Sequence, residues 1–170
     1  FDPVDFPDPA GYFREMRALG FHVSLWHLPY IKEPSRYFDD LKAVDGFVKT
    51  RDGGIYDVSQ PWDATPGIKG VIDFTNPRAV AVYQEYCRRV LKLGARCLKT
   101  DFGEDAPLDG VYANGLDGRH NHNLYPLLYN QAAFAVTQEV HGPQDGVVWA
   151  RSAWAGNQRY PLHWGGDVAP

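Results

Sequence analysis

Helical and strand-like segments alternate along this chain and are joined mostly by short connectors. In some segments the apolar residues recur at helical spacing, and short runs typical of buried strands stand between them. Such alternation is typical of βαβ units on a parallel sheet. The sequence predicts helices at 9–19, 35–44, 77–93 and 124–140, strands at 22–26, 96–101, 147–151 and 160–164, and a hairpin turn at 51–55.

Local residues mark where these segments begin and end. Asn76 and Pro77 provide an N-cap and a first-turn proline for the third predicted helix, and Gly94 ends it. The segment 109–123 is rich in Gly, Asn and Asp, and is therefore predicted to be a loop.

The length of the chain limits the closed form that this pattern can take. An eight-stranded (β/α)₈ barrel typically needs about 250 residues, with about 200 as a lower bound, whereas this chain has 170. We therefore predict an α/β fold that is a partial (β/α)₈ TIM barrel. It would contain about four to five parallel strands, intervening helices and a small hairpin insertion. Residues 1–170 would form a single segment of a barrel domain within a larger protein.

Composition and charge narrow the classes of function. The net charge is −4 and there is no basic cluster, so nucleic acid is not an expected partner. No apolar run approaches the roughly 18 residues that a membrane span requires, so no membrane partner is expected. Cys87 and Cys97 do not make a disulfide framework, and we expect free thiols and a cytoplasmic location.

Polar residues gather where the predicted strands end. Asp101 follows one strand and Asp167 follows another, and catalytic residues of barrel enzymes lie at such ends. Two carboxylic groups, one ionised and one protonated, are what the cleavage of a glycosidic bond requires. The alternative is that each Asp only caps a helix or anchors a loop. The same ends also carry Lys99, Arg151, Trp26, Phe102 and Trp164.

His120 and His122 form a His-x-His pair of the kind found in metal sites. The pair lies in a polar segment without other obvious ligands, so a solvated or helix-capping role is predicted. The chain also lacks dinucleotide-binding, phosphate-loop and zinc-protease motifs. We therefore expect no cofactor and no metal.

The sequence Lys-Thr-Asp-Phe-Gly-Glu at 99–104 resembles the nucleophile motif of glycoside hydrolase family 31, in the form found among its bacterial α-xylosidases. Stretches at 26–31, 73–77, 150–153 and 163–167 are similar to the same family in the same order. Asp167 stands 66 residues after Asp101, which is the family's interval between nucleophile and acid. The resemblance covers essentially all 170 residues.

This resemblance implies a retaining glycosidase that works by double displacement. Asp101 would be the nucleophile, and Asp167 would be the general acid and then the general base. Lys99 and Arg151 would bind sugar hydroxyls or the surroundings of the nucleophile. The residues implied to contact the substrate are Lys99, Arg151, Trp26, Trp164 and Phe102.

The expected activity is that of an α-xylosidase-like hydrolase segment whose partner is an α-linked oligosaccharide or glycoside. α-Glucosidase or sulfoquinovosidase activity of the same family is the first alternative. A second alternative is a sugar-binding half-barrel that is inactive without further strands and that pairs with a second copy or with the remainder of a parent chain. A third is a purely structural segment, in which Asp101→Asn would change nothing.

Overall fold

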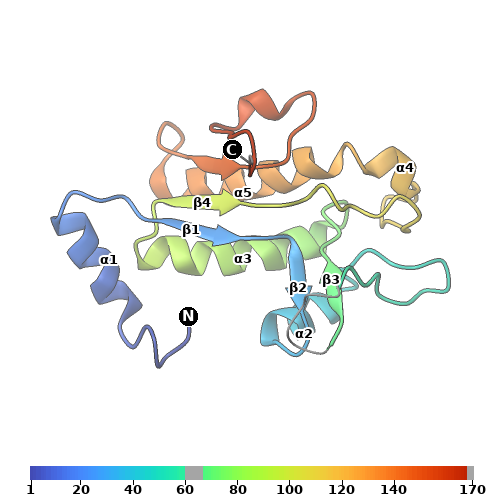
Figure 1. Cartoon of the computed structure of the whole chain (residues 1–170), viewed down its shortest axis with the longest axis horizontal. Helices are drawn as coiled ribbons and strands as arrows, with labels where there is room; N and C mark the ends of the chain where they lie inside the picture. The colour runs from blue at the N-terminus through green and yellow to red at the C-terminus, as the bar shows by residue number, and fades with distance from the viewer. Residues whose placement is uncertain (60–66, 168–170) are drawn as a thin grey trace.

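The computed structural model describes residues 1–59 and 67–167. Figure 1 shows strands β1, β4 and β5 side by side, helices α3 and α5 behind them, and a lobe around α2, β2 and β3 at one end of the sheet. In chain order the elements are α1 (Pro9–Ala18), β1 (Ser24–His27), β2 (Tyr30–Lys32), α2 (Arg36–Lys42), β3 (Lys69–Val71), α3 (Pro77–Leu93), β4 (Cys97–Thr100), α4 (Gly118–Asn121), α5 (Tyr125–His141), β5 (Val148–Ala150) and the short 3₁₀ helix η1 (Asn157–Arg159).

The main sheet is parallel, with the strand order β1–β4–β5. Its register places Trp26 beside Lys99 and Lys99 beside Trp149, so these three side chains share one face. Helix α5 packs on β4 and β5 and against α3, and both helices lie on the face of the sheet that does not carry these three side chains. This half-wound arrangement of parallel strands and helices is a partial (β/α)₈ barrel, as predicted, but within residues 1–59 and 67–167 the parallel sheet has three strands and not the expected four to five.

The two faces of the sheet differ in burial. Leu98 and Val148 point toward the helices and are at most 1% exposed. Trp26 and Trp149 point the other way and remain 55% and 38% exposed. In a closed barrel the second face would be the interior.

The ends of α3 follow the residues that the sequence singled out. The side chain of Asn76 accepts a hydrogen bond from the backbone N–H of Arg78, and Pro77 occupies the first turn. Gly94 ends the helix with φ of +131°, and a Cβ there would lie 2.6 Å from Phe13 in α1. Glycine is thus required both by the left-handed backbone and by the close approach of α1.

The lobe at the end of β1 contains the predicted hairpin turn. Lys49 and Ile55 form an antiparallel bridge, and the N–H of Thr50 donates to the carbonyl of Gly54 at 2.8 Å. Strands β2 and β3 pair antiparallel beside this turn. The lobe matters for the site because β2 carries Tyr30, whose hydroxyl accepts hydrogen bonds from the loop that follows β4.

Two sequence-based expectations were wrong in detail. The segment 109–123 is not only a loop, because it contains α4, capped by the side chain of Asp117. The segment 160–164 is not a regular strand: His163 alone forms a parallel bridge, with Ala150. Its backbone nevertheless runs along β5, because the N–H groups of Leu162 and Trp164 donate to the carbonyls of Val148 and Ala150.

The structure also bears on two further predictions, the state of the two cysteines and the lack of a membrane span. Cys87 is buried and Cys97 is half-buried, and both are free, as predicted. Within residues 1–59 and 67–167, none of the helices is long and apolar enough to span a bilayer.

Candidate active site

Asp101 is the first residue after β4, and the sheet fixes its position. Its N–H donates to the carbonyl of His27 at the end of β1, at 2.9 Å. Asp101 lies two positions after Lys99, so both belong to the face of the sheet that the helices do not cover. Asp101 is 7% exposed, which leaves little water around its carboxylate.

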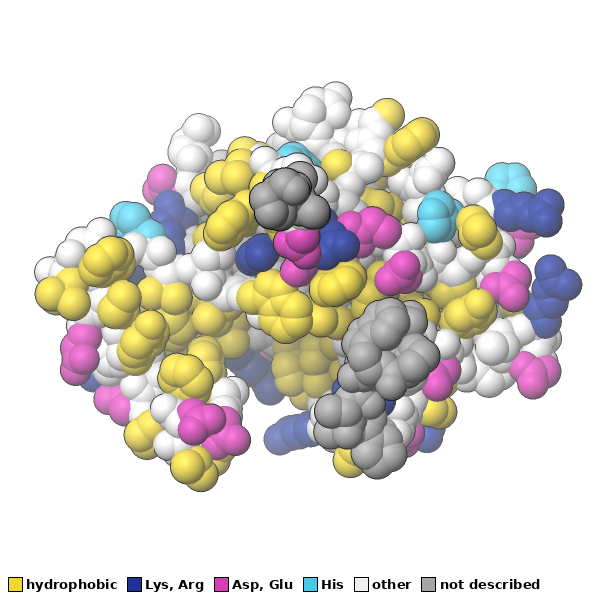
Figure 2. All heavy atoms as spheres, viewed as in Figure 1, with side chains coloured by type: hydrophobic (Ala, Val, Ile, Leu, Met, Phe, Trp, Pro, Cys, Tyr) yellow, Lys and Arg dark blue, Asp and Glu magenta, His cyan; other side chains and the backbone are white. Residues whose placement is uncertain are grey.

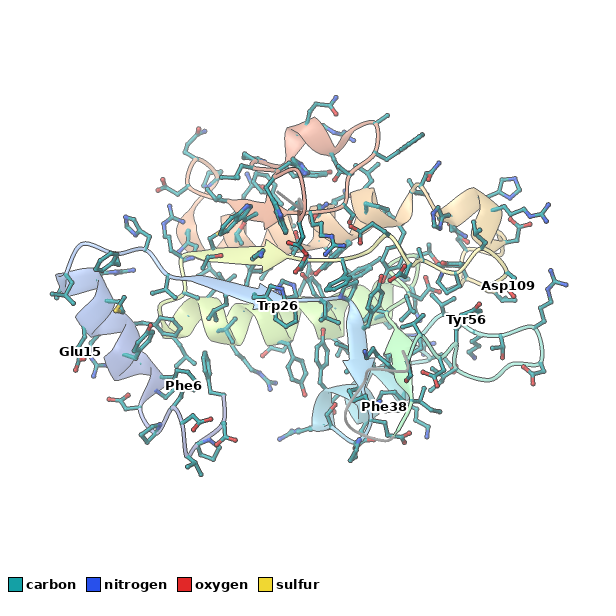
Figure 3. The ribbon with its side chains drawn as sticks, in the orientation of Figure 1. Phe6, Glu15, Trp26, Phe38, Tyr56 and Asp109 are labelled. Carbon is teal, nitrogen blue, oxygen red and sulfur yellow. The ribbon has the colours of Figure 1, made fainter. Side chains whose placement is uncertain are left out.

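Three donors converge on the Asp101 carboxylate. Trp26 Nε1 donates to Oδ2 at 2.5 Å, and the N–H of Phe102 donates to Oδ1 at 3.0 Å. Arg151 Nη1 lies 3.5 Å from the same Oδ1. Figure 3 labels Trp26, which lies on β1 next to this group. Hydrogen bonds from both sides therefore fix the orientation of the carboxylate.

Arg151 joins the two carboxylates that the sequence predicts to be catalytic. Its Nη1 lies 3.5 Å from Asp101 Oδ1 and also 3.5 Å from Asp167 Oδ2. These two oxygens are therefore no farther apart than twice 3.5 Å. Paired carboxyl groups of retaining glycosidases lie about 5–5.5 Å apart, and those of inverting enzymes about 6.5–9.5 Å. The side chain of Asp167 is 87% exposed, unlike that of Asp101.

Two neighbours hold the Arg151 guanidinium in place. Its Nε donates to Glu104 Oε1 at 2.7 Å, and its Cζ lies 4.5 Å from the centre of the Phe102 ring. Burial acts to lower the pKa of Arg151, but the nearby carboxylates outweigh it and raise that pKa. Sequence reasoning did not select Glu104 as a site residue, although it closes the 99–104 motif.

The backbone turns sharply between Asp101 and Glu104. Phe102 has φ of +57° and Gly103 has φ of +105°. Ser152 Oγ donates to the Phe102 carbonyl at 2.7 Å, and a Cβ on Gly103 would lie 2.6 Å from that Oγ. A non-glycine residue in the left-handed region stores strain, which the surrounding hydrogen bonds overcome. The turn aims the Phe102 ring at Arg151.

Lys99 contacts aromatic rings instead of the carboxylates. Its Nζ lies 4.5 Å from the centre of the Trp164 ring and 5.3 Å from that of Trp149. The two indoles themselves meet edge to face, 5.6 Å apart. Figure 2 shows charged side chains of both signs among hydrophobic ones near the middle of this face. Trp149 was not among the site residues selected from the sequence, because its position within a predicted buried strand is typical of a core residue.

The His-x-His pair does not converge on a common point. His120 is exposed and pairs through Nδ1 with Asp117, the cap of α4, at 2.7 Å. His122 Nδ1 lies 2.6 Å from the Ala106 carbonyl. In the described ranges 1–59 and 67–167, no group of three or more His, Cys, Asp or Glu side chains could hold a metal ion.

Known proteins of one family match this chain over its whole length. The family model for the "Glycosyl hydrolases family 31 TIM-barrel domain" matches residues 1–170. An α-xylosidase of Emericella nidulans is 37% identical over 168 residues, which is 98% of this chain and 21% of that protein. An α-xylosidase of Lactiplantibacillus pentosus is 38% identical over 153 residues, or 89% of this chain and 20% of that protein.

The solved structures agree with this match. A family 31 sulfoquinovosidase from E. rectale, in complex with an aza-sugar inhibitor, superposes with a TM-score of 0.84 at 28% identity. That match covers 95% of this chain and 24% of the other. The chain thus spans about a fifth to a quarter of the length of the proteins that it matches.

Proposed function

We propose that this chain, which belongs to glycosyl hydrolase family 31, is the central part of a retaining α-glycosidase that acts on α-xylosides. The observation that carries the proposal is the contact of one guanidinium, that of Arg151, with both Asp101 and Asp167. The similarity to two α-xylosidases supports the choice of sugar.

The chemistry has two steps. In the first, a carboxylate oxygen of Asp101 attacks the anomeric carbon while the protonated Asp167 gives its proton to the departing glycosidic oxygen. This step breaks the glycosidic bond and forms a covalent glycosyl ester on Asp101. In the second, Asp167 takes a proton from a water molecule, whose oxygen attacks the anomeric carbon and releases Asp101.

The surrounding residues prepare Asp101 for attack. Trp26 holds Oδ2, while the Phe102 N–H and Arg151 hold Oδ1 on the side where Asp167 lies. Phe102 acts by supporting the guanidinium, because its ring faces Arg151. We assign Trp26, Lys99 and Trp164 to the binding of the sugar, since indole faces pack well on the C–H face of a pyranose and the ammonium donates to hydroxyls.

Activity requires more than this segment. Trp26 and Trp149 are exposed on the face that a closed barrel would bury, and within the described ranges β1 pairs only with β4. We propose that residues 1–170 are one segment of a catalytic barrel, completed by the remainder of a parent chain, in a cytoplasmic enzyme. The pairing of two copies remains the alternative way to cover the open face.

The test is made in the complete enzyme that contains this segment. We expect Asp101→Asn to reduce kcat/KM for an aryl α-xyloside by about three orders of magnitude or more. Asp109→Asn is the matched control, because Asp109 is exposed and accepts a hydrogen bond from the Tyr56 hydroxyl, far from Trp26 in Figure 3. Normal activity of Asp101→Asn would refute the proposal. If the unmodified enzyme cleaves an α-glucoside or a sulfoquinovoside faster than the α-xyloside, that glycoside becomes the assigned substrate in place of the α-xyloside.

A further inference from the structure

A pocket of about 290 Å³ opens beside Arg151, between the loops that follow β4 and β5. Its walls include Glu104, Arg151, Ser152, His122 and Asn123. The lining does not include the two predicted catalytic carboxylates or the indoles assigned above to the sugar that is transferred. It is therefore a separate recess next to the proposed catalytic centre, and its volume is close to the lower limit of about 300 Å³ for small-molecule sites.

The hydrogen bond made by His122 fixes the chemistry of its ring. The Ala106 carbonyl can only accept, so Nδ1, at 2.6 Å, carries the hydrogen. In the neutral ring Nε2 is then unprotonated and acts as an acceptor. His122 lines the pocket and thus offers it an acceptor for a hydroxyl hydrogen.

The other walls offer both donors and acceptors. Arg151 uses Nε for Glu104 and Nη1 for the two aspartates, and among the described residues its Nη2 has no hydrogen-bond partner. Glu104 bonds to Arg151 through Oε1, which leaves Oε2 as an acceptor. The exposed Asn123 adds an amide that both donates and accepts. Because a cation and a carboxylate stand together here, the pocket favours a neutral polyhydroxylated ligand over an ion.

The position of the pocket selects one part of the substrate. Arg151 lines the pocket and also contacts both carboxylates, so its guanidinium separates the pocket from the carboxylate pair. We propose that the pocket binds the leaving-group sugar of the α-glycoside, with His122 Nε2 accepting a hydrogen bond from one of its hydroxyls. This inference rests on the proposed function, because the leaving group must lie beside Asp167, which protonates it.

The experiment compares two substrates in the complete enzyme. One is a disaccharide in which α-xylose is linked to glucose, and the other is p-nitrophenyl α-xyloside, whose leaving group has no sugar hydroxyls. We expect His122→Ala to lower kcat/KM for the disaccharide about tenfold more than for the aryl substrate, which corresponds to the loss of one neutral hydrogen bond. Asn123→Ala should give the same kind of difference, and its exposed side chain makes a folding defect a poor explanation.

His120→Ala is the matched control. His120 lies two residues from His122, pairs with Asp117 and does not line the pocket, so neither substrate should be affected. Equal losses on both substrates in the His122 and Asn123 variants would overturn the inference, and so would unchanged disaccharide cleavage in both. An unmodified enzyme that cleaves neither substrate would instead refute the proposed function, and this inference with it.

Discussion

The hydrogen bond between Trp26 and Asp101 makes the most specific claim about the site. Nε1 of Trp26 lies 2.5 Å from Oδ2 of a carboxylate that is only 7% exposed. Trp26→Phe keeps an aromatic ring on the open face of the sheet but removes this donor. The nucleophile would then lose the interaction that fixes one of its two oxygens.

The size of the effect follows from the geometry. A hydrogen bond to a charged group contributes about 1.5–3 kcal/mol. Trp26 itself is 55% exposed, so water replaces part of the lost donor and the lower value applies. A loss of about 1.5 kcal/mol corresponds to a decrease of about tenfold in kcat/KM.

The matched control is Trp149→Phe. Trp149 lies on the same face of the sheet, in register with Lys99 and therefore in the same row as Trp26, but its ring contacts Lys99 and Trp164 instead of Asp101. Steady-state kinetics on an aryl α-xyloside in the complete enzyme, with thermal unfolding measured in parallel, separates the two. Unchanged activity in Trp26→Phe, or an equal decrease in both variants at equal stability, would refute the role given to this hydrogen bond.

Three further predictions concern stability. Burial lowers the pKa of His27 to about 4, so the unfolded state binds the proton more readily than the folded state. The contribution of His27 to the free energy of unfolding therefore decreases as the pH falls from about 6.5 to 4. In urea titrations, the free energy of unfolding should decrease less between pH 7 and pH 5 in His27→Phe than in the unmodified protein. Gly103→Ala should destabilise by about 1–3 kcal/mol in thermal unfolding, because its backbone is left-handed and the new Cβ meets Ser152, and an unchanged melting temperature would contradict this. Asn76→Ala should lower the free energy of unfolding by about 1–2 kcal/mol, because the side chain caps α3 and also donates to the carbonyls of residues 44 and 45. Asn76→Asp keeps the cap but loses these donors, so its stability in a urea titration should lie between that of the unmodified protein and that of Asn76→Ala.

The parts of the fold that depend on local chemistry could be predicted from the sequence. Asn76, Pro77 and Gly94 set the ends of α3 because caps, prolines and left-handed glycines act on their own backbone neighbours. The same holds for the turn between Lys49 and Ile55, where the hydrogen bond closes within five residues.

Contacts between distant segments could not be predicted in this way. Tyr30 accepts hydrogen bonds from Gly103 and Asp105, more than seventy residues later, and no local pattern encodes that meeting. Glu104 lies in a recognisable motif, but its partner Arg151 becomes apparent only when β4 and β5 pair. The segment 160–164 does hydrogen-bond to β5 through Leu162 and Trp164, but His163 alone forms a bridge there, and apolar content does not encode the register between two segments.

The most direct test of the central claim is to trap the covalent intermediate. The complete enzyme would be incubated with a fluorinated α-xylosyl fluoride, and its peptides would then be analysed by mass spectrometry. If Asp101 is the nucleophile, the added sugar mass lies on the peptide that contains residues 99–104 and is absent from Asp101→Asn. Labelling of a different carboxylate, or turnover of the reagent with inversion at the anomeric carbon and no adduct, would contradict the assignment of Asp101 and Asp167 as a retaining pair.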